Sequence, residues 1–199
     1  DRLQDHASPE KVARVAEELG CTSVAFTYND PTIFAEYAID VALACHERDV
    51  RTVAVTAGYI CEAPRTDFYR VMDAANVDLK GFTQQFYKRL CMSDLAPVLE
   101  TLLYLKHETD VWFEITNLVI PDANDDFKQF DEMTDWIIDH LGVDVPLHFT
   151  AFHPDFRMKH TPKTPIHVLH QAQSIAKSKG IRYVYVGNVH DATHSNTYC

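Results

Sequence analysis

The chain has 199 residues, of which 46% are hydrophobic and 24% charged, and its formal net charge at pH 7 is −11. This length suits one sizeable core or two small ones, and the composition is ordinary for a globular domain. The acidic balance argues against a nucleic-acid backbone or an anionic membrane as partner, and no apolar stretch is long enough to span a bilayer.

Strand patterns and helix patterns alternate from the N-terminal end. Ser8 is a preferred N-cap, Pro9 suits the first helical position, and Gly20 ends the helix that they begin. Apolar and β-branched runs predict strands at 23–27, 51–56, 76–80, 111–120, 147–150 and 181–186. Helices are predicted between them at about 31–48, through 68–75, around 98–105 after a cap at Ser93 or Asp94, at 127–141 after a cap at Asn124, and from 165 to Gly180.

Strands that are regularly separated by helices predict right-handed crossovers and a parallel sheet. Six strands are too few for a complete eight-stranded barrel, so an open or partial barrel and a doubly wound sheet both fit. No linker-like segment appears, and we expect one domain over 1–199. In either architecture the C-terminal ends of the strands form the edge that carries chemistry.

Polar side chains gather on one face of three consecutive strands. Because side chains alternate along a strand, each strand places a polar pair on one side: Asp78 and Lys80, Glu114 and Thr116, His148 and Thr150. Polar groups inside a helix-covered sheet are costly unless they line a pocket. Each pair also has a structural explanation, as an ion pair or as a hydrogen-bonded core histidine, but their coincidence at one sheet edge favours a site.

Two other strand ends carry polar or flexible residues. Asp30 precedes Pro31, which is typical of a helix N-cap, although a cap does not need the preceding Tyr28 and Asn29. Thr56 ends the strand before Gly58, and glycine either permits close approach of a ligand or simply forms a turn.

Cysteines and histidines predict no metal site. The five cysteines are scattered and none has C-x-x-C spacing; Cys45 lies on an apolar helical face and is expected in the core. No secretory signal is visible, so reduced thiols and a cytoplasmic location are expected. His148 and His153 lie near one strand end without a third ligand, and His190 and His194 are expected to face solvent.

Taken together, the ordered strand-end motifs resemble the radical S-adenosylmethionine (SAM) enzymes. The resemblance is to the branch of the pyruvate formate-lyase-activating enzymes, and within it to the AmmeMemoRadiSam-system enzymes. It spans nearly the whole chain and depends on six segments: 27–32, 56–59, 77–82, 119–125, 148–154 and 183–188. It implies an α/β partial (β/α)₆ TIM-like barrel of the radical SAM type whose first strand is missing here.

The resemblance also implies a cofactor chemistry. A C-x₃-C-x₂-C loop after the first strand would hold a [4Fe–4S] cluster, and one electron from a donor such as flavodoxin or ferredoxin would cleave SAM to a 5′-deoxyadenosyl radical. That radical would abstract hydrogen from an unknown substrate. The cysteine triplet is absent from this chain, and members continue beyond a Tyr-Cys like Tyr198-Cys199. We therefore expect a core domain truncated at both ends, inactive alone, with no assigned catalytic residue.

Individual contacts follow from the resemblance by position. Tyr28, Asn29 and Asp30 match the segment at the SAM amino group, where Glu is common in place of Asp30, and Lys80 matches a lysine near the SAM carboxylate. The complete set expected to bind SAM is Tyr28, Asn29, Asp30, Thr56, Gly58, Asp78, Lys80, Glu114, Thr116, His148 and His153. We expect four of its members to surround a single cavity, namely Asp30, Lys80, Glu114 and His153.

Two other hypotheses remain. Lys80, with Asp78 nearby, would suit a cluster-free lyase that forms a Schiff base with a carbonyl substrate. Alternatively, the chain would be a non-catalytic barrel that binds SAM or a partner, which fits the departures from the family pattern at Asp30 and Ala57.

Overall fold

A computed structural model describes residues 7–191 and 193–197 of the chain. Within this part, six strands form a single parallel sheet in which sequence neighbours are also spatial neighbours. The strands are β1 (Ser23–Phe26), β2 (Arg51–Thr56), β3 (Ala74–Asp78), β4 (Trp112–Val119), β5 (Leu147–Ala151) and β6 (Val184–Gly187).

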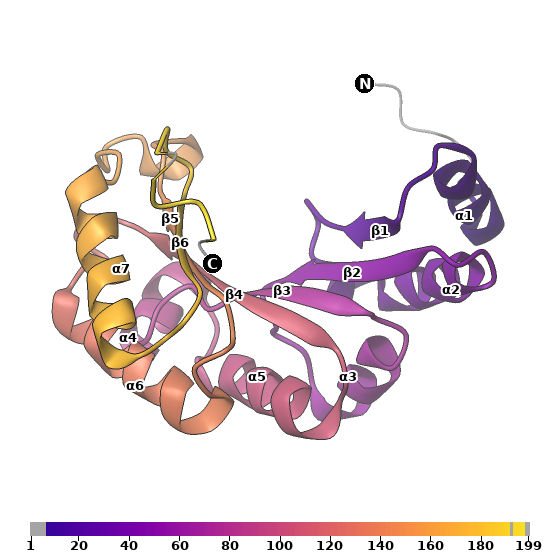
Figure 1. Ribbon diagram of the computed structural model, residues 1–199, viewed down its shortest axis with the longest axis horizontal. Helices are drawn as coiled ribbons and strands as arrows, with labels where there is room; N and C mark the ends of the chain where they lie inside the picture. The colour runs from indigo at the N-terminus through magenta and orange to yellow at the C-terminus, as the bar shows by residue number, and fades with distance from the viewer. Residues whose placement is uncertain (1–6, 192, 198–199) are drawn as a thin grey trace.

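The sheet curves into an open arc with helices along its outer side, and β1 and β6 lie at opposite ends of the arc (Figure 1). This confirms the predicted α/β partial barrel. The α-helices are α1 (Pro9–Glu18), α2 (Ala35–His46), α3 (Glu62–Tyr69), α4 (Gln84–Phe86), α5 (Ala96–Glu108), α6 (Phe127–Leu141) and α7 (Ile166–Lys179). Three short segments complete the description: the 3₁₀ turns η1 (Pro31–Phe34) and η3 (Phe156–Met158) and the π-helical turn η2 (Tyr87–Cys91). None of the described helices is both long and apolar enough to cross a membrane.

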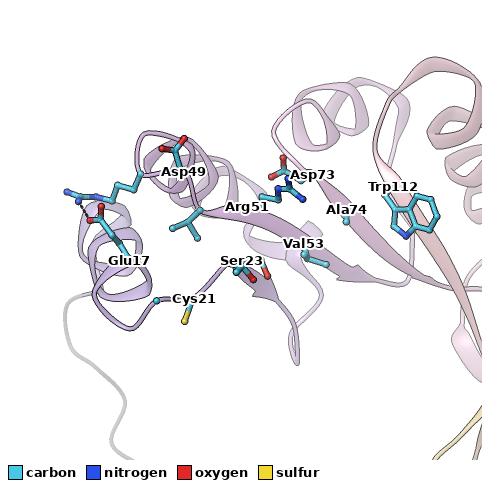
Figure 2. Close-up of a pocket in the computed structure, with 13 residues that line it drawn as sticks. Glu17, Cys21, Ser23, Asp49, Arg51, Val53, Asp73, Ala74 and Trp112 are labelled. Atoms are coloured by element: carbon cyan, nitrogen blue, oxygen red, sulfur yellow. Dashed lines mark hydrogen bonds and ion pairs between the residues drawn. The ribbon is translucent and has the colours of Figure 1, made fainter. Parts of the chain in front are cut away.

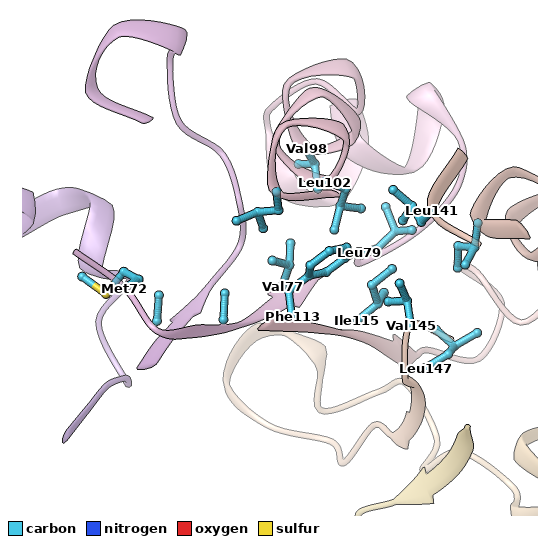
Figure 3. Close-up of a cluster of buried hydrophobic side chains, with 14 of the residues drawn as sticks. Met72, Val77, Leu79, Val98, Leu102, Phe113, Ile115, Leu141, Val145 and Leu147 are labelled. Carbon is cyan, nitrogen blue, oxygen red and sulfur yellow. The ribbon is translucent and has the colours of Figure 1, made fainter. Parts of the chain in front are cut away.

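The core lies between the outer face of the sheet and the helices. Leu102 of α5 packs against three fully buried side chains of the sheet: Val77 in β3, Leu79 just after β3, and Ile115 in β4 (Figure 3). Burial of each such side chain stabilises the fold by about 1.5–3 kcal/mol before the entropy cost of ordering it. The strict alternation of buried and partly exposed residues along β3 and β4 is the period-two pattern that predicted these strands.

One predicted helix lies too far along the chain. The helix expected through 68–75 is α3, which ends at Tyr69, and the strand expected at 76–80 is β3, which begins at Ala74. Two alanines favour a helix locally, but Ala75 pairs with Ala54 of β2 and Phe113 of β4. Tertiary pairing therefore overrides local propensity here. The last strand likewise begins at Val184 rather than at 181.

Two predicted caps are also wrong. Neither Ser93 nor Asp94 caps α5, because Leu95 occupies the N-cap position; the carboxylate of Asp94 instead pairs with Lys88 at 2.8 Å. Asp126 caps α6 by accepting a hydrogen bond from the backbone N–H of Lys128. Asn124, the predicted cap, is buried and links two strand ends instead.

Candidate functional site

The inner face of the sheet, which the helices leave uncovered, is polar. The three pairs predicted to share a face do so: all six side chains are partly exposed, between neighbours that are buried on the helix side. The register places Asp78 beside Thr116, and Thr116 beside His148. The sequence therefore identified the lining of the arc correctly.

A cavity of about 370 Å³ lies on this face at the C-terminal ends of β3, β4 and β5. Its size falls within the range of about 300–1,000 Å³ that is usual for ligand pockets. Its lining is mostly apolar with a few polar groups, and consists of Asp78, Lys80, Phe86, Leu90, Cys91, Thr116, Leu118, Ile120, Thr150 and Met158. Of the predicted SAM-binding residues, Asp78, Lys80 and Thr116 are in this described lining.

An ion pair forms part of the cavity lining. Lys80 Nζ lies 2.7 Å from Asp78 Oδ2, and each side chain is about one-third exposed. The backbone N–H of Lys80 donates to the hydroxyl of Tyr87 at 3.2 Å, and the carbonyl of Lys80 accepts from Asn124 Nδ2 at 2.7 Å. Burial raises the pKa of Tyr87, so this phenol stays neutral. The end of the strand is thus fixed from both sides while its charged side chains face the cavity.

Sequence reasoning missed the wall opposite the strands. Leu90 and Cys91 come from η2, and Met158 from η3, so loops after two different strands close over the cavity. Met92, which follows η2, has a positive φ of 53°, so the chain turns sharply there. Burial raises the pKa of the Cys91 thiol, and the charge of Lys80 partly offsets that effect.

A second polar pair lies on the same face, two residues nearer the start of β4 and β5 than Thr116 and Thr150. His148 Nε2 is 2.6 Å from Glu114 Oε2, and the imidazole stacks on Tyr185 with ring centres 5.0 Å apart. The hydrogen bond from His148 lowers the pKa of Glu114, against the opposing effect of burial. Glu114 therefore pairs with His148, and His148 is partly exposed rather than a residue of the core.

Asp30 acts as a cap and as a link between strand ends. Its carboxylate accepts from the backbone N–H of Thr32 at 3.0 Å, from the Thr56 hydroxyl at 2.9 Å and from the Ala57 N–H at 2.7 Å. Three protein donors therefore hold the group that was expected to contact SAM. Tyr28 and Asn29 beside it are exposed.

Gly58 is required by the packing of the protein itself. Its φ is +66°, and a Cβ at this position would lie 2.8 Å from Cγ1 of Val77. The close approach is therefore to β3, on the helix side of the sheet, and Thr56 is buried on the same side. The turn interpretation of this strand end fits the geometry, because left-handed backbone favours glycine.

The expectation that four residues surround one cavity is wrong. Within the described residues that line the cavity, Lys80 is the only member of that set. Asp30 is held by donors from η1 and from the end of β2, and Glu114 is paired with His148. His153 is exposed in the loop after β5. Sharing an edge of a curved sheet does not bring the tips of distant strands together. The roles of these residues in SAM binding stay predictions.

A larger hollow of about 800 Å³ lies at the opposite edge, where the strands begin (Figure 2). Ser23, Arg51, Ala74 and Trp112 line it at the starts of β1 to β4, and an ion pair between Glu17 and Arg48 closes one side. We do not place the site there, because the ends of parallel strands that carry chemistry are the C-terminal ones.

The described cysteines do not form a site for a [4Fe–4S] cluster. Cys21 and Cys61 are exposed, Cys45 is buried in the core as predicted, and Cys91 is half-buried. No group of three cysteines gathers among residues 7–191 and 193–197, and Cys199 lies outside the described part. A cluster of this kind is usually held by cysteine thiolates, so the described residues do not fit one.

Comparison of the sequence with known proteins gives one informative relative. No family model matches the chain. The chain is 38% identical over 192 residues to an uncharacterized protein of Methanocaldococcus jannaschii. The match covers 96% of this chain and 56% of that protein, so the chain spans a little over half the length of its relative.

Comparison of the fold is more specific. A domain of pyruvate-formate lyase-activating enzyme from Bacteroides vulgatus has a TM-score of 0.72 at 17% identity, over 83% of this chain and 98% of that domain. Streptococcus suis SuiB bound to S-adenosylmethionine has a TM-score of 0.73 at 15% identity, over 96% of this chain and 46% of SuiB. A radical SAM methyltransferase from Sphaerobacter thermophilus has a TM-score of 0.68 at 15% identity, over 94% and 59% of the two chains. At these identities the likeness establishes the fold: this chain has the partial α/β barrel of radical SAM enzymes.

Proposed function

We propose that this chain is the SAM-binding core of a radical SAM enzyme, and that SAM binds in the cavity at the ends of β3, β4 and β5. The observation that carries the proposal is this cavity, with the Lys80–Asp78 ion pair in its lining. It lies at the edge of the sheet where this class of fold places ligands.

The chemistry of the lining suits a molecule that is charged at one end and aromatic at the other. Lys80 is placed to bind a carboxylate, and Asp78 an ammonium group. Thr116 and Thr150 offer hydroxyls on neighbouring strands, and Leu118 gives an apolar surface for a heterocycle. The same lining supports the resemblance-based prediction for Asp78, Lys80 and Thr116 independently of sequence motifs.

The proposal for this chain is confined to binding and orienting SAM. One-electron cleavage of SAM needs a cluster that the described residues do not fit, and no step is assigned to them. For the whole protein the proposal extends to hydrogen abstraction from an unknown substrate, with a one-electron donor such as flavodoxin or ferredoxin. Assignment to the activating-enzyme branch, or to the AmmeMemoRadiSam system within it, is likewise a proposal based on the motifs.

The Schiff-base alternative finds less support. A lysine must present a free neutral amine to attack a carbonyl, whereas Lys80 Nζ is engaged with Asp78 at 2.7 Å. In its SAM-binding form, the non-catalytic alternative differs from the leading proposal only in the activity of the whole protein. In its partner-binding form it does not require SAM to bind, so a SAM titration separates it from the leading proposal.

Calorimetric titration of the purified chain with SAM tests the proposal. We expect saturable binding with one site, and a loss of about tenfold or more in affinity in Lys80→Met, since a charge-assisted hydrogen bond contributes about 1.5–3 kcal/mol. Lys163→Met, which changes an exposed lysine outside the cavity lining, is the matched control. Absence of binding, or equal affinity in Lys80→Met and wild type, would remove SAM from this cavity.

A further inference from the structure

A cluster of three metal-ligating side chains lies apart from the proposed SAM cavity. His170 Nε2 is 2.6 Å from Asp191 Oδ2, and His194 Nδ1 is 2.8 Å from the same oxygen. The two imidazole rings stack with centres 3.9 Å apart and planes at 25°. His194 was expected to face solvent; it is half-buried, because the chain folds back and packs it against His170. His190, which was also predicted to face solvent, is exposed as expected.

The three side chains come from separate elements that the fold fixes in place. His170 belongs to α7, whereas Asp191 and His194 follow β6. The segment after β6, yellow in Figure 1, returns to β6 so that the backbone N–H of Val186 donates to the carbonyl of His194 at 3.0 Å. The side-chain amide of Gln173, also on α7, donates to that carbonyl as well.

The two oxygens of the Asp191 carboxylate have different partners. Its Oδ1 accepts from the backbone N–H groups of Thr193 and His194, at 3.0 and 3.1 Å, which orients the side chain within its turn. Its Oδ2 is directed at both imidazoles. Protein groups that fix the orientation of a ligand in this way are what metal sites use as outer-shell support.

We propose that His170 Nε2, His194 Nδ1 and Asp191 Oδ2 bind a divalent transition-metal ion of the zinc class. The three ligand atoms lie within 4.8 Å of one another. A tetrahedral ion with bonds of about 2.0–2.2 Å requires ligand atoms about 3.3 Å apart, so small side-chain rotations complete the site. Two imidazoles and one carboxylate suit zinc, cobalt or nickel, whereas calcium and magnesium prefer oxygen ligands alone.

The two histidines of the cluster are partly exposed. Each histidine side chain is 34% exposed and the Asp191 side chain is 10% exposed, so solvent reaches the imidazoles and we expect water as the fourth ligand. An ion bound here joins α7 to the segment beside β6. We therefore expect metal binding to stabilise the end of the sheet, since an ion that binds only the folded state raises its stability.

Zinc titration of the metal-free chain tests the proposal. The protein is treated with a chelator, its thiols are blocked with N-ethylmaleimide so that cysteines do not compete, and ZnCl₂ is titrated by calorimetry. His170→Gln, Asp191→Asn and His194→Gln each remove one ligand. His190→Gln, which changes an exposed neighbouring histidine outside the cluster, is the control.

We expect one zinc ion per wild-type chain, affinity at least tenfold weaker in each ligand variant, and unchanged affinity in His190→Gln. At a free zinc concentration of about 100 times Kd, the Tm of wild type should rise by about 5 °C or more. CoCl₂ should give visible absorption bands of a four-coordinate ion in wild type, a readout that needs no variant.

Two outcomes would overturn the proposal. One is wild-type protein that neither binds zinc nor shows a zinc-dependent Tm, which would make the cluster a hydrogen-bonded arrangement of two imidazoles on one carboxylate. The other is binding that persists in variants whose circular dichroism matches wild type. His170→Gln leaves the backbone hydrogen bonds of the segment after β6 in place, so it is the variant that should remain folded if others do not.

Discussion

Asn124 should contribute more to stability than its place in a loop suggests. Its Oδ1 accepts from the backbone N–H of Ile120 at 2.6 Å, and its Nδ2 donates to the carbonyls of Lys80 and Leu118 at 2.7 and 2.9 Å. The residue is 2% exposed, so water cannot replace these bonds without rearrangement. Asn124 thereby joins the ends of β3 and β4, next to Lys80 and Ile120 of the cavity lining.

Asn124→Ala leaves one buried donor and two buried acceptors without their partner. Each unsatisfied buried group costs about 1–3 kcal/mol, and carbonyls with a second partner lose less, so we expect a total of about 3–5 kcal/mol. For a chain of this size that loss lowers Tm by about 6–20 °C. Urea unfolding followed by tryptophan fluorescence, with circular dichroism as a second probe, measures the change.

Two further variants make the test specific. Asn124→Asp keeps the acceptor for Ile120 but places a carboxylate oxygen against two carbonyls, so its deficit should shrink as falling pH protonates it. Asn29→Ala, an exposed change, should stay within about 0.5 kcal/mol of wild type. A value for Asn124→Ala within about 1 kcal/mol of wild type would contradict the reasoning, because it would mean that the buried bonds are readily replaced.

Three other changes should behave as follows. Glu114→Gln removes a carboxyl group whose pKa is lowered from 4.5 by the hydrogen bond from His148. The ionised carboxylate therefore stabilises wild type above pH 4.5, and this contribution is lost as the pH falls further. Both side chains are about one-third exposed, so the variant should lose under about 1 kcal/mol of unfolding free energy at pH 7, measured by urea unfolding. The difference from wild type should disappear in acid, and a difference that stays constant with pH would refute the linkage. Gly58→Ala meets both a φ of +66° and Cγ1 of Val77, and should cost about 2 kcal/mol or more by the same assay, with an unchanged midpoint refuting the packing argument. Arg65 is buried, and among the described residues its Nε and Nη1 have no hydrogen-bond partner, although the guanidinium lies over the Tyr104 ring at 5.1 Å. Met can keep an apolar contact with that ring, so Arg65→Met should leave Tm within a few degrees of wild type or raise it, and a large drop in Tm would contradict this expectation.

The inner and outer faces of the sheet could be predicted because they depend on neighbours in the sequence. Alternation along a strand puts Asp78 and Lys80 on one face and Val77 and Leu79 on the other, whatever the rest of the chain does. Helices between strands then require parallel pairing. These local rules were sufficient for a parallel α/β sheet and for the polar lining of the arc, whereas the choice of a partial barrel over a doubly wound sheet came from the resemblance to a known family.

Element ends and partners depend on contacts between distant segments, and there the sequence was insufficient. The pattern at Asn124 fits a cap equally well, and only the fold brings it under the carbonyl of Lys80, 44 positions earlier. The same holds for Cys91 and Met158, which line the same cavity although 67 positions separate them in the sequence.

His170 and His194 show most clearly what the sequence alone determines and what only the tertiary structure decides. The sequence supplies two imidazole side chains, but 24 positions separate them and no local spacing indicates that they meet. Their meeting at Asp191 follows from the docking of α7 and from the return of the chain beside β6. Short-range sterics and hydrophobic alternation thus determine which face a residue takes, while the path of the folded backbone decides which residues act together.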